Sequence, residues 1–232
     1  MSGKYNGAQA IITQTYKDCI YSSCANHSLN LVGVDCAKSC KEAITFFGIV
    51  QKLYNVFSSS PQRWEILKKH IKVSLHQTST TRWSARIDCV RPIARHFRDV
   101  QNAVNELSQS TNLTTECRAD ISGIKSYFTK FESLLLSSIW VKVLADIHDT
   151  NLIIQCRDAT LDVEKANIQR LAKSMNDLRE RWSEILSEVS IVATNVQLTT
   201  DFAVRRGESQ EEARTRFRVD VFMSSLIVSS QG

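Results

Sequence analysis

The chain is poor in the residues that form tight turns. Its 232 residues include only seven Gly and two Pro, at positions 61 and 92. β-Sandwiches and β-barrels need many tight turns, which these residues supply, so the composition disfavours both folds. Hydrophobic residues make up 43% of the chain and charged residues 23%, which is ordinary for a globular protein. We therefore expect a packed and mainly helical protein.

The sequence also has no long apolar run and no strong excess of one charge. Its most apolar stretch, Leu134 to Ala145, contains Lys142 and is shorter than the roughly 20 residues that span a bilayer, so we expect no membrane partner. The net charge of +5, from 29 Lys and Arg against 24 Asp and Glu, permits contact with nucleic acid. It is smaller than the excess that a dedicated phosphate-binding surface carries.

The seven cysteines do not form a disulfide framework. They are odd in number and widely spaced, and no secretory leader precedes them, which favours a reducing compartment. Cys24 and His27 have the spacing of half a zinc site, which Cys36 and Cys40 could complete. The alternative is that these thiols are buried and structural, because free Cys is among the most buried residue types. Since no second pair of closely spaced ligands accompanies them, we favour this alternative.

Apolar side chains recur at three- and four-residue steps through most of the chain, as in amphipathic helices. The segments with this pattern are residues 8–15, 39–58, 62–71, 87–104, 121–147 and 161–192. Pro61 suits the first residue of the third helix, because its missing N–H has no intrahelical partner there. Pro92 should kink the fourth helix or begin its regular part. The best strand candidate is Cys19–Ser23, and Ile71–Leu75 is a second short extended segment.

The last helical segment has the most regular pattern. Its heptad positions are Leu161, Ile168, Met175, Trp182 and Val189, with Leu171, Leu178, Ile185 and Val192 at the complementary position. A pattern of this length predicts a coiled-coil-like seam. The seam packs either against helices of the same chain or against another chain, and the irregular shapes of Met175 and Trp182 favour the first interpretation.

Arg91, Arg95 and Arg98 fall on the side of the fourth helix opposite its apolar face. A solvated helix face is the simpler interpretation of this stripe, because paired basic faces are routine. The alternative is that the three arginines contact phosphate groups.

Two short motifs, in this order, carry a resemblance to a known family. The first is Cys24-Ala-Asn-His27-Ser-Leu-Asn-Leu31, which follows the first strand candidate, and the second is Thr81-Arg82-Trp83-Ser84. Together they resemble the core of transposases of the hAT superfamily, in particular the domesticated copies in zinc finger MYM-type and related nuclear proteins. The resemblance extends from Ser2 to about Phe222.

This resemblance implies roles for four residues. Cys24 and His27 would lie at the end of the last core strand of an RNase H-like domain, where they brace the site and position DNA without binding metal. Arg82 and Trp83 would contact DNA, with Trp83 stacked on an unpaired or flipped base at the cleaved end. The alternative for Trp83 is a packing anchor at the start of a helix, as is common for aromatic residues.

The same resemblance implies that the catalytic residues lie elsewhere. Phosphoryl transfer on DNA in this superfamily needs three carboxylates that hold two divalent metal ions. The two aspartates are expected before residue 1, and the glutamate is expected near or beyond the end of the chain. We interpret Glu164, Glu180, Glu184 and Glu188 as solvent-facing helix formers. We therefore expect no catalysis and no cofactor here, with a divalent ion such as Mg²⁺ only in a complete relative.

We expect a mainly α fold with two parts and a tail. Residues 1–37 would be the C-terminal remnant of an RNase H-like α/β core with one or two short strands. Residues 38–222 would be a large all-helical insertion domain, and residues 223–232 a disordered tail. The implied function is nuclear DNA binding, ancestrally with DNA strand transfer, by a fragment of a hAT-type transposase-derived protein without a small-molecule substrate.

Two alternatives stay open at this point. The first is a helical protein–protein interaction module of a transcriptional regulator, which uses the seam at residues 161–192 and could also self-associate through it. The second is a zinc-stabilised binding domain held by Cys24, His27, Cys36 and Cys40.

Overall fold

The computed structural model describes residues 7–19, 24–78 and 86–226, and these contain helices and no β-strand. The helices are α1 (Ala8–Thr15), α2 (Ala25–Lys38), α3 (Lys41–Ser58), α4 (Pro61–His70), α5 (Ile87–Arg95), α6 (Phe97–Ser108), α7 (Thr115–Phe128), α8 (Phe131–Ile154), α9 (Leu161–Glu180), α10 (Trp182–Asn195), α11 (Gln210–Arg216) and the π-helix η2 (Phe217–Met223). The prediction of a mainly α protein is confirmed. Within the described ranges, no helix has the length and apolar character needed to cross a membrane.

The helix α8 is the element around which the others pack. From Phe131 to Ser137 its buried side chains lie on all of its sides, and from Ile139 to Ile154 they lie on one broad side. These apolar surfaces must be covered, and α2, α3, α5, α7, α9 and α10 all pack against α8. The ring of the fully buried Trp140 meets the ring of Phe47 edge to face, with 4.8 Å between the ring centroids.

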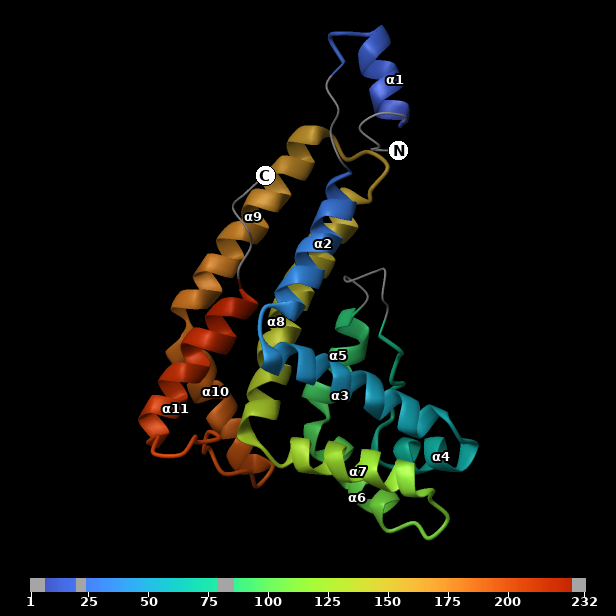
Figure 1. Ribbon diagram of the computed structural model, residues 1–232, viewed down its shortest axis with the longest axis vertical. Coiled ribbons are helices and arrows are strands. Elements are labelled where there is room, and N and C mark those ends of the chain that lie inside the picture. Colours follow the sequence, from blue (N-terminus) through green and yellow to red (C-terminus); the bar gives the residue numbers. More distant parts are fainter. Residues whose placement is uncertain (1–6, 20–23, 79–85, 227–232) are drawn as a thin grey trace.

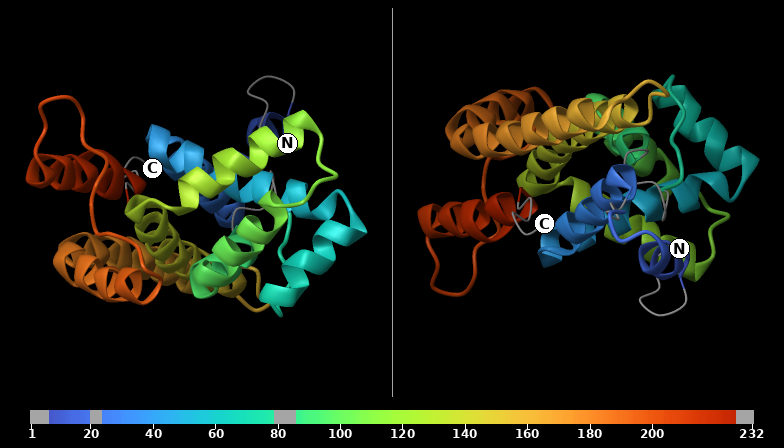
Figure 2. Two further views of the ribbon diagram at one scale, coloured as in Figure 1. Left: turned by 90° about the horizontal axis from the view of Figure 1, so that it is seen from below. Right: turned by 90° about the horizontal axis from the view of Figure 1, so that it is seen from above.

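Figure 1 shows two groups of helices around α8. The helices α2, α8 and α9 run along the long axis of the molecule, whereas α3, α4, α6 and α7 lie near one end of it. In the second group, α4 and α7 each pack against both α3 and α6. Figure 2, which looks along the long axis, shows α4 and α11 on opposite sides of the molecule. The helix α1 lies apart from both groups and has no buried residue.

The predicted helix at residues 121–147 is two helices in the structure. Lys130 has an extended backbone (φ −94°, ψ 139°) and separates α7 from α8. The turn lets Phe128 pack against Phe97 and lets Phe131 pack against Phe202, with ring centroids 5.3 and 5.4 Å apart. The prediction of one helix was wrong because the apolar period continues in phase through the turn.

The heptad segment is also two helices, because the chain leaves helical geometry at Arg181 (φ −88°, ψ 18°) between α9 and α10. Its buried positions are Leu171, Met175, Leu178, Trp182, Ile185 and Val189. Since α9 and α10 both pack against α8, this part of the seam lies within the chain, as the intramolecular interpretation predicts. Leu161 and Ile168 are 75% and 40% exposed, so the seam is uncovered in the first half of α9.

The two prolines differ in their positions within helices. Pro61 is the first residue of α4, as predicted. Pro92 lies inside α5 and does not begin it, and the helix ends at His96 (φ −119°, ψ 37°), after which α6 starts. A proline lacks only the N–H that bonds toward the preceding turn, so the break four residues later has another origin.

The two predicted extended segments and the predicted tail have different outcomes. Ile71–Leu75 forms no strand, and of Cys19–Ser23 only Cys19 lies within the described residues. In the tail, Ser225 and Leu226 are buried, and the carbonyl oxygen of Leu226 accepts a hydrogen bond of 2.8 Å from Arg179. These contacts order residues 223–226, which the sequence predicted to be disordered, and residues 227–232 lie outside the described residues.

Replacement of the central indole tests the role of α8. Trp140→Ala should lower the free energy of unfolding by about 3–5 kcal/mol, because it removes a fully buried side chain and leaves a cavity among packed helices. Urea denaturation measures this change. As a control, Leu161→Ala alters a side chain that is 75% exposed and should change stability by less than about 0.5 kcal/mol. Equal effects of the two substitutions would contradict a central role for α8.

Candidate nucleic-acid interface

The structure places two of the four residues to which the sequence motifs assign roles. Cys24 is the N-cap residue of α2, and His27 lies in the first turn of that helix. Both residues are exposed, and the Cys24 side chain makes no capping hydrogen bond. Arg82 and Trp83 lie outside the described residues, so the joint action of the two motifs stays a prediction.

The four residues of the proposed zinc set do not form one metal site. Cys36 lies twelve residues after Cys24 on α2, which corresponds to about 18 Å along the helix axis, far more than one ion can bridge. In the part of the chain that the structure describes, no three His, Cys, Asp or Glu side chains are grouped so as to hold a metal ion. Cys36 is buried and Cys40 is half-buried, as expected of structural thiols.

Positive charge is concentrated in one segment of the chain. Residues 63–98 contain nine of the 29 Lys and Arg residues but only two of the 24 Asp and Glu residues, so this segment carries a net +7 and the remainder a net −2. The segment comprises most of α4, the residues that follow it, α5 and the start of α6, and it includes Arg82 and Trp83. We call it the basic segment. The modest net charge of the whole chain does not reveal this local excess of Lys and Arg, which is of the kind that phosphate-binding surfaces carry.

Several cations of the basic segment stabilise the fold. Lys69 and His70 of α4 contact the carboxylate of Glu106 on α6 at 3.0 and 2.8 Å, and these two hydrogen bonds lower the pKa of Glu106. The guanidinium of Arg86 lies 5.1 Å from the centroid of the Phe47 ring, and its partial burial lowers its pKa. These residues connect α4, α5 and their neighbours.

Other cations of the basic segment remain available to a ligand. Lys72 and Arg95 are exposed and Arg91 is half-buried, and none of the three forms a hydrogen bond or an ion pair with another described residue. The Arg98 side chain is exposed and donates a hydrogen bond of 3.1 Å to the carbonyl oxygen of Asn195. Two members of the predicted arginine stripe are therefore free to pair with phosphate groups.

Trp64 is a candidate binding residue that the sequence analysis missed. It lines a hollow of about 240 Å³ together with Lys68, Lys72 and Val73. Its half-buried ring meets the ring of Tyr54 edge to face at 6.2 Å. An indole beside two lysines is suited to stack on a base while the cations pair with the backbone. Part of the signal was present in the sequence, because Trp64 and Lys68 are four residues apart and lie on the same face of α4.

No protein-family model, curated protein or solved structure matches this chain. The expected relationship to hAT transposases therefore rests on the two sequence motifs alone. The candidate site is defined by the charge of the basic segment, by Lys72, Arg91 and Arg95, which are unpaired among the described residues, and by the Trp64 hollow.

Alkaline pH should destabilise the protein through two buried thiols. Burial raises the pKa of Cys36 and of Cys89 from 9.0 to about 11. Because the folded state favours the neutral thiol, this contribution to stability is complete below the pKa of the unfolded chain and is lost as pH rises through the folded pKa. The free energy of unfolding should therefore fall between about pH 9 and about pH 11. Urea denaturation across this range measures the fall, and an equally steep fall in Cys36→Ala/Cys89→Ala would contradict this cause.

Proposed function

We propose that this chain binds DNA in the nucleus as part of a hAT-type transposase-derived protein. The observation that carries the proposal is the net +7 of residues 63–98, which surrounds the Thr81-Arg82-Trp83 motif. Cations of the basic segment pair with phosphates, and Trp83 and Arg82 contact an unpaired base and its backbone. Phosphate contacts of this kind position the nucleic acid, and stacking holds its single-stranded part.

In this proposal the chain holds DNA and does not cut it. The resemblance assigns the three catalytic carboxylates to regions on either side of these residues. Of the four glutamates considered above, Glu184 pairs with Arg181 at 2.7 Å and Glu188 pairs with Lys142 at 3.1 Å. Glu180 is exposed and Glu164 is half-buried. Their pairing and their position on the helix surface support a structural role.

The exposed apolar residues of α1 support the proposed RNase H-like remnant at residues 1–37. Ile11, Ile12 and Tyr16 are 61%, 49% and 64% exposed. A helix of eight residues is not stable in water without packing, so α1 needs a covering surface. The sheet of an RNase H-like core is the cover that the resemblance implies, and it would adjoin Cys24 and His27 at the start of α2.

A second candidate function is protein–protein interaction through the first half of α9. Leu161, Val163 and Ile168 are 75%, 41% and 40% exposed, and Leu152 near the end of α8 is 52% exposed. Leu161 and Ile168 are seven residues apart and lie on the same face of α9, and exposed apolar side chains that share a helix face can mark an interaction site. The interacting part of the seam is then this face, which we call the α9 patch, since the seam is buried from Leu171 to Val189.

Loss of the stacking residue tests the DNA proposal. Trp83→Ala should weaken binding to hairpin-ended or single-stranded DNA by roughly 5- to 150-fold, because stacking on one base contributes about 1–3 kcal/mol. Fluorescence anisotropy with labelled DNA measures the affinity. Equal binding by the wild type and the variant would remove Trp83 from the site.

Two charge-reversal double variants extend this experiment, one in the basic segment and one outside it as the control. Arg91→Glu/Arg95→Glu should weaken binding to all DNA probes and reduce the salt dependence of the affinity. Arg170→Glu/Lys173→Glu changes two exposed cations of α9 outside the basic segment and should leave the affinity within about twofold. If both double variants lose affinity equally, binding is non-specific attraction and the basic segment is not the interface.

The second candidate makes a separate prediction for oligomeric state. If the α9 patch binds another copy of the chain, the wild type should sediment as a larger species with rising concentration, and Ile168→Glu should stay monomeric. Ile44→Glu, at a 54% exposed position of α3, is the matched control and should behave as the wild type. A wild type that is monomeric at all concentrations excludes self-association through this patch.

A further inference from the structure

A groove lies between α10 and the segment formed by α11 and η2. It consists of two hollows of about 220 and 270 Å³, and Glu211 and Arg214 line both of them. On α10, Trp182 borders one hollow, and Leu186 and Ser190 border the other. Since residues four apart lie on one helix face, the two hollows follow the same side of α10 and adjoin at Arg214. We call them together the α10–α11 groove.

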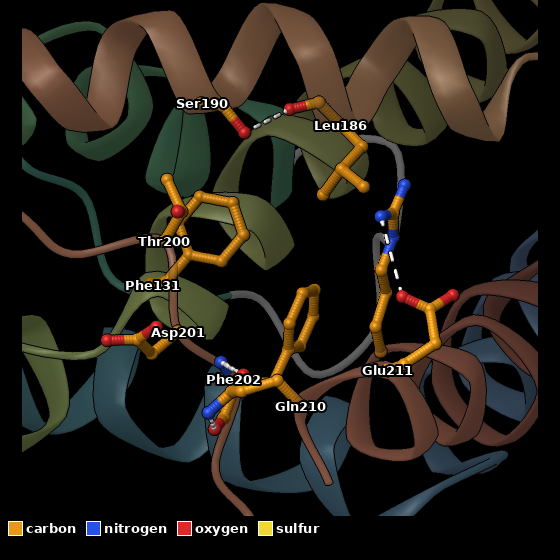
Figure 3. A pocket seen from close by; sticks show the side chains of 9 residues that line it. Phe131, Leu186, Ser190, Thr200, Asp201, Phe202, Gln210 and Glu211 are labelled. Atoms are coloured by element: carbon orange, nitrogen blue, oxygen red, sulfur yellow. Dashed lines mark hydrogen bonds and ion pairs between the residues drawn. The ribbon is translucent and has the colours of Figure 1, made fainter.

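The floor of the groove is aromatic. Figure 3 shows Phe131, Phe202 and Leu186 pointing into the first hollow. In the second hollow the ring of Trp182 packs against the ring of Phe222, with 5.0 Å between the centroids. Burial of apolar partner side chains on such a floor is the main favourable term in protein association.

Two polar side chains that line the first hollow already have partners. The side chain of Gln210 accepts a hydrogen bond of 2.9 Å from the backbone N–H of Phe202 and donates one of 3.1 Å to its carbonyl oxygen. The Ser190 hydroxyl donates to the carbonyl oxygen of Leu186 at 2.7 Å. An occupant that places apolar side chains on the aromatic floor leaves these hydrogen bonds intact.

The two ends of the groove carry opposite charges. Asp201 lines the first hollow and Arg218 lines the second. Both are exposed, and neither pairs with another residue in the described ranges. The charges between them, Glu211 and Arg214, lie 4.0 Å apart and neutralise each other. The groove is thus complementary to a segment with a basic residue at one end and an acidic residue at the other.

The length of the groove matches two turns of a helix. From Trp182 to Ser190 the axis of α10 advances about 12 Å, and side chains seven residues apart on a helix are separated by about 10.5 Å along its axis. The wall opposite α10 includes the π-helix η2, a geometry that is rare and is frequently found at functional sites. We propose that the α10–α11 groove binds an amphipathic helix of a partner protein, with two apolar anchors two turns apart, a basic residue over Asp201 and an acidic residue over Arg218.

Synthetic helical peptides of about 14 residues, long enough for nearly four turns, test this proposal. Three peptides share two Leu anchors seven residues apart and differ only at their ends. The first has Lys at one end and Glu at the other, the second has Lys at both ends, and the third has Glu at both ends. Titrations with the full chain, followed by fluorescence anisotropy of the labelled peptide, should show that the Lys/Glu peptide binds at least tenfold tighter than the other two. In Arg218→Glu the preference should change to the peptide with Lys at both ends, because both ends of the groove are then acidic.

A matched pair of substitutions locates the binding. Val219 lines the groove and is 57% exposed, whereas Ile191 is 64% exposed on α10 and does not line it. Val219→Glu should weaken binding of the Lys/Glu peptide at least tenfold, and Ile191→Glu should leave it unchanged, with circular dichroism confirming that both variants are folded.

Three results would overturn the proposal. The first is that none of the peptides binds the folded wild type at about 1 mM, and the second is that the two substitutions weaken binding equally. The third is a concentration-dependent dimer of the wild type that Val219→Glu abolishes, which would assign the groove to a second copy of this chain.

Discussion

The burial of most of α8 is the constraint on which the rest of the structure depends. Fourteen of its 24 residues are buried, so its neighbours must use their own apolar faces to cover them. The helix α5 packs its apolar side, including Val90 and Ile93, against α8 and leaves Arg91 and Arg95 toward its polar side. The helix α10 likewise uses Ile185 and Val189 in the core, and its remaining face borders the groove.

The contacts within the fold account for only part of the net charge of the basic segment. Glu106 forms an ion pair with Lys69 and contacts the ring of His70, and the Phe47 ring stabilises Arg86, but Lys72 and the arginines of α5 have no such partners among the described residues. Concentrated like charges repel one another and destabilise a compact state. A segment that carries them nonetheless is suited to an anionic partner, and DNA is the partner that the Arg82-Trp83 motif implies.

The two proposed surfaces are compatible with each other. The basic segment includes α4 and the groove is bordered by α11, and these helices lie on opposite sides of the molecule (Figure 2). A partner helix in the groove therefore leaves the basic segment accessible to nucleic acid. The buried α8 connects the two regions, since both α5 and α10 pack against it. If both proposals hold, the protein would bring a DNA end and a second protein together.

The sequence by itself determined the helical class, the start of α4 at Pro61 and the buried side of most helices, because apolar spacing records which side of a helix avoids water. It also contained the Trp64, Lys68 and Lys72 spacing. Only the tertiary structure decided the turns at Lys130 and Arg181 and the separation of Cys24 from Cys36 by most of the length of α2. The groove, too, was decided only by the tertiary structure, since its lining comes from α8, α10, α11 and the segment that joins α10 to α11. Apolar periodicity indicates which face of a helix is buried, but it does not indicate which element covers that face. Side chains that are far apart in the chain meet only when the helices pack.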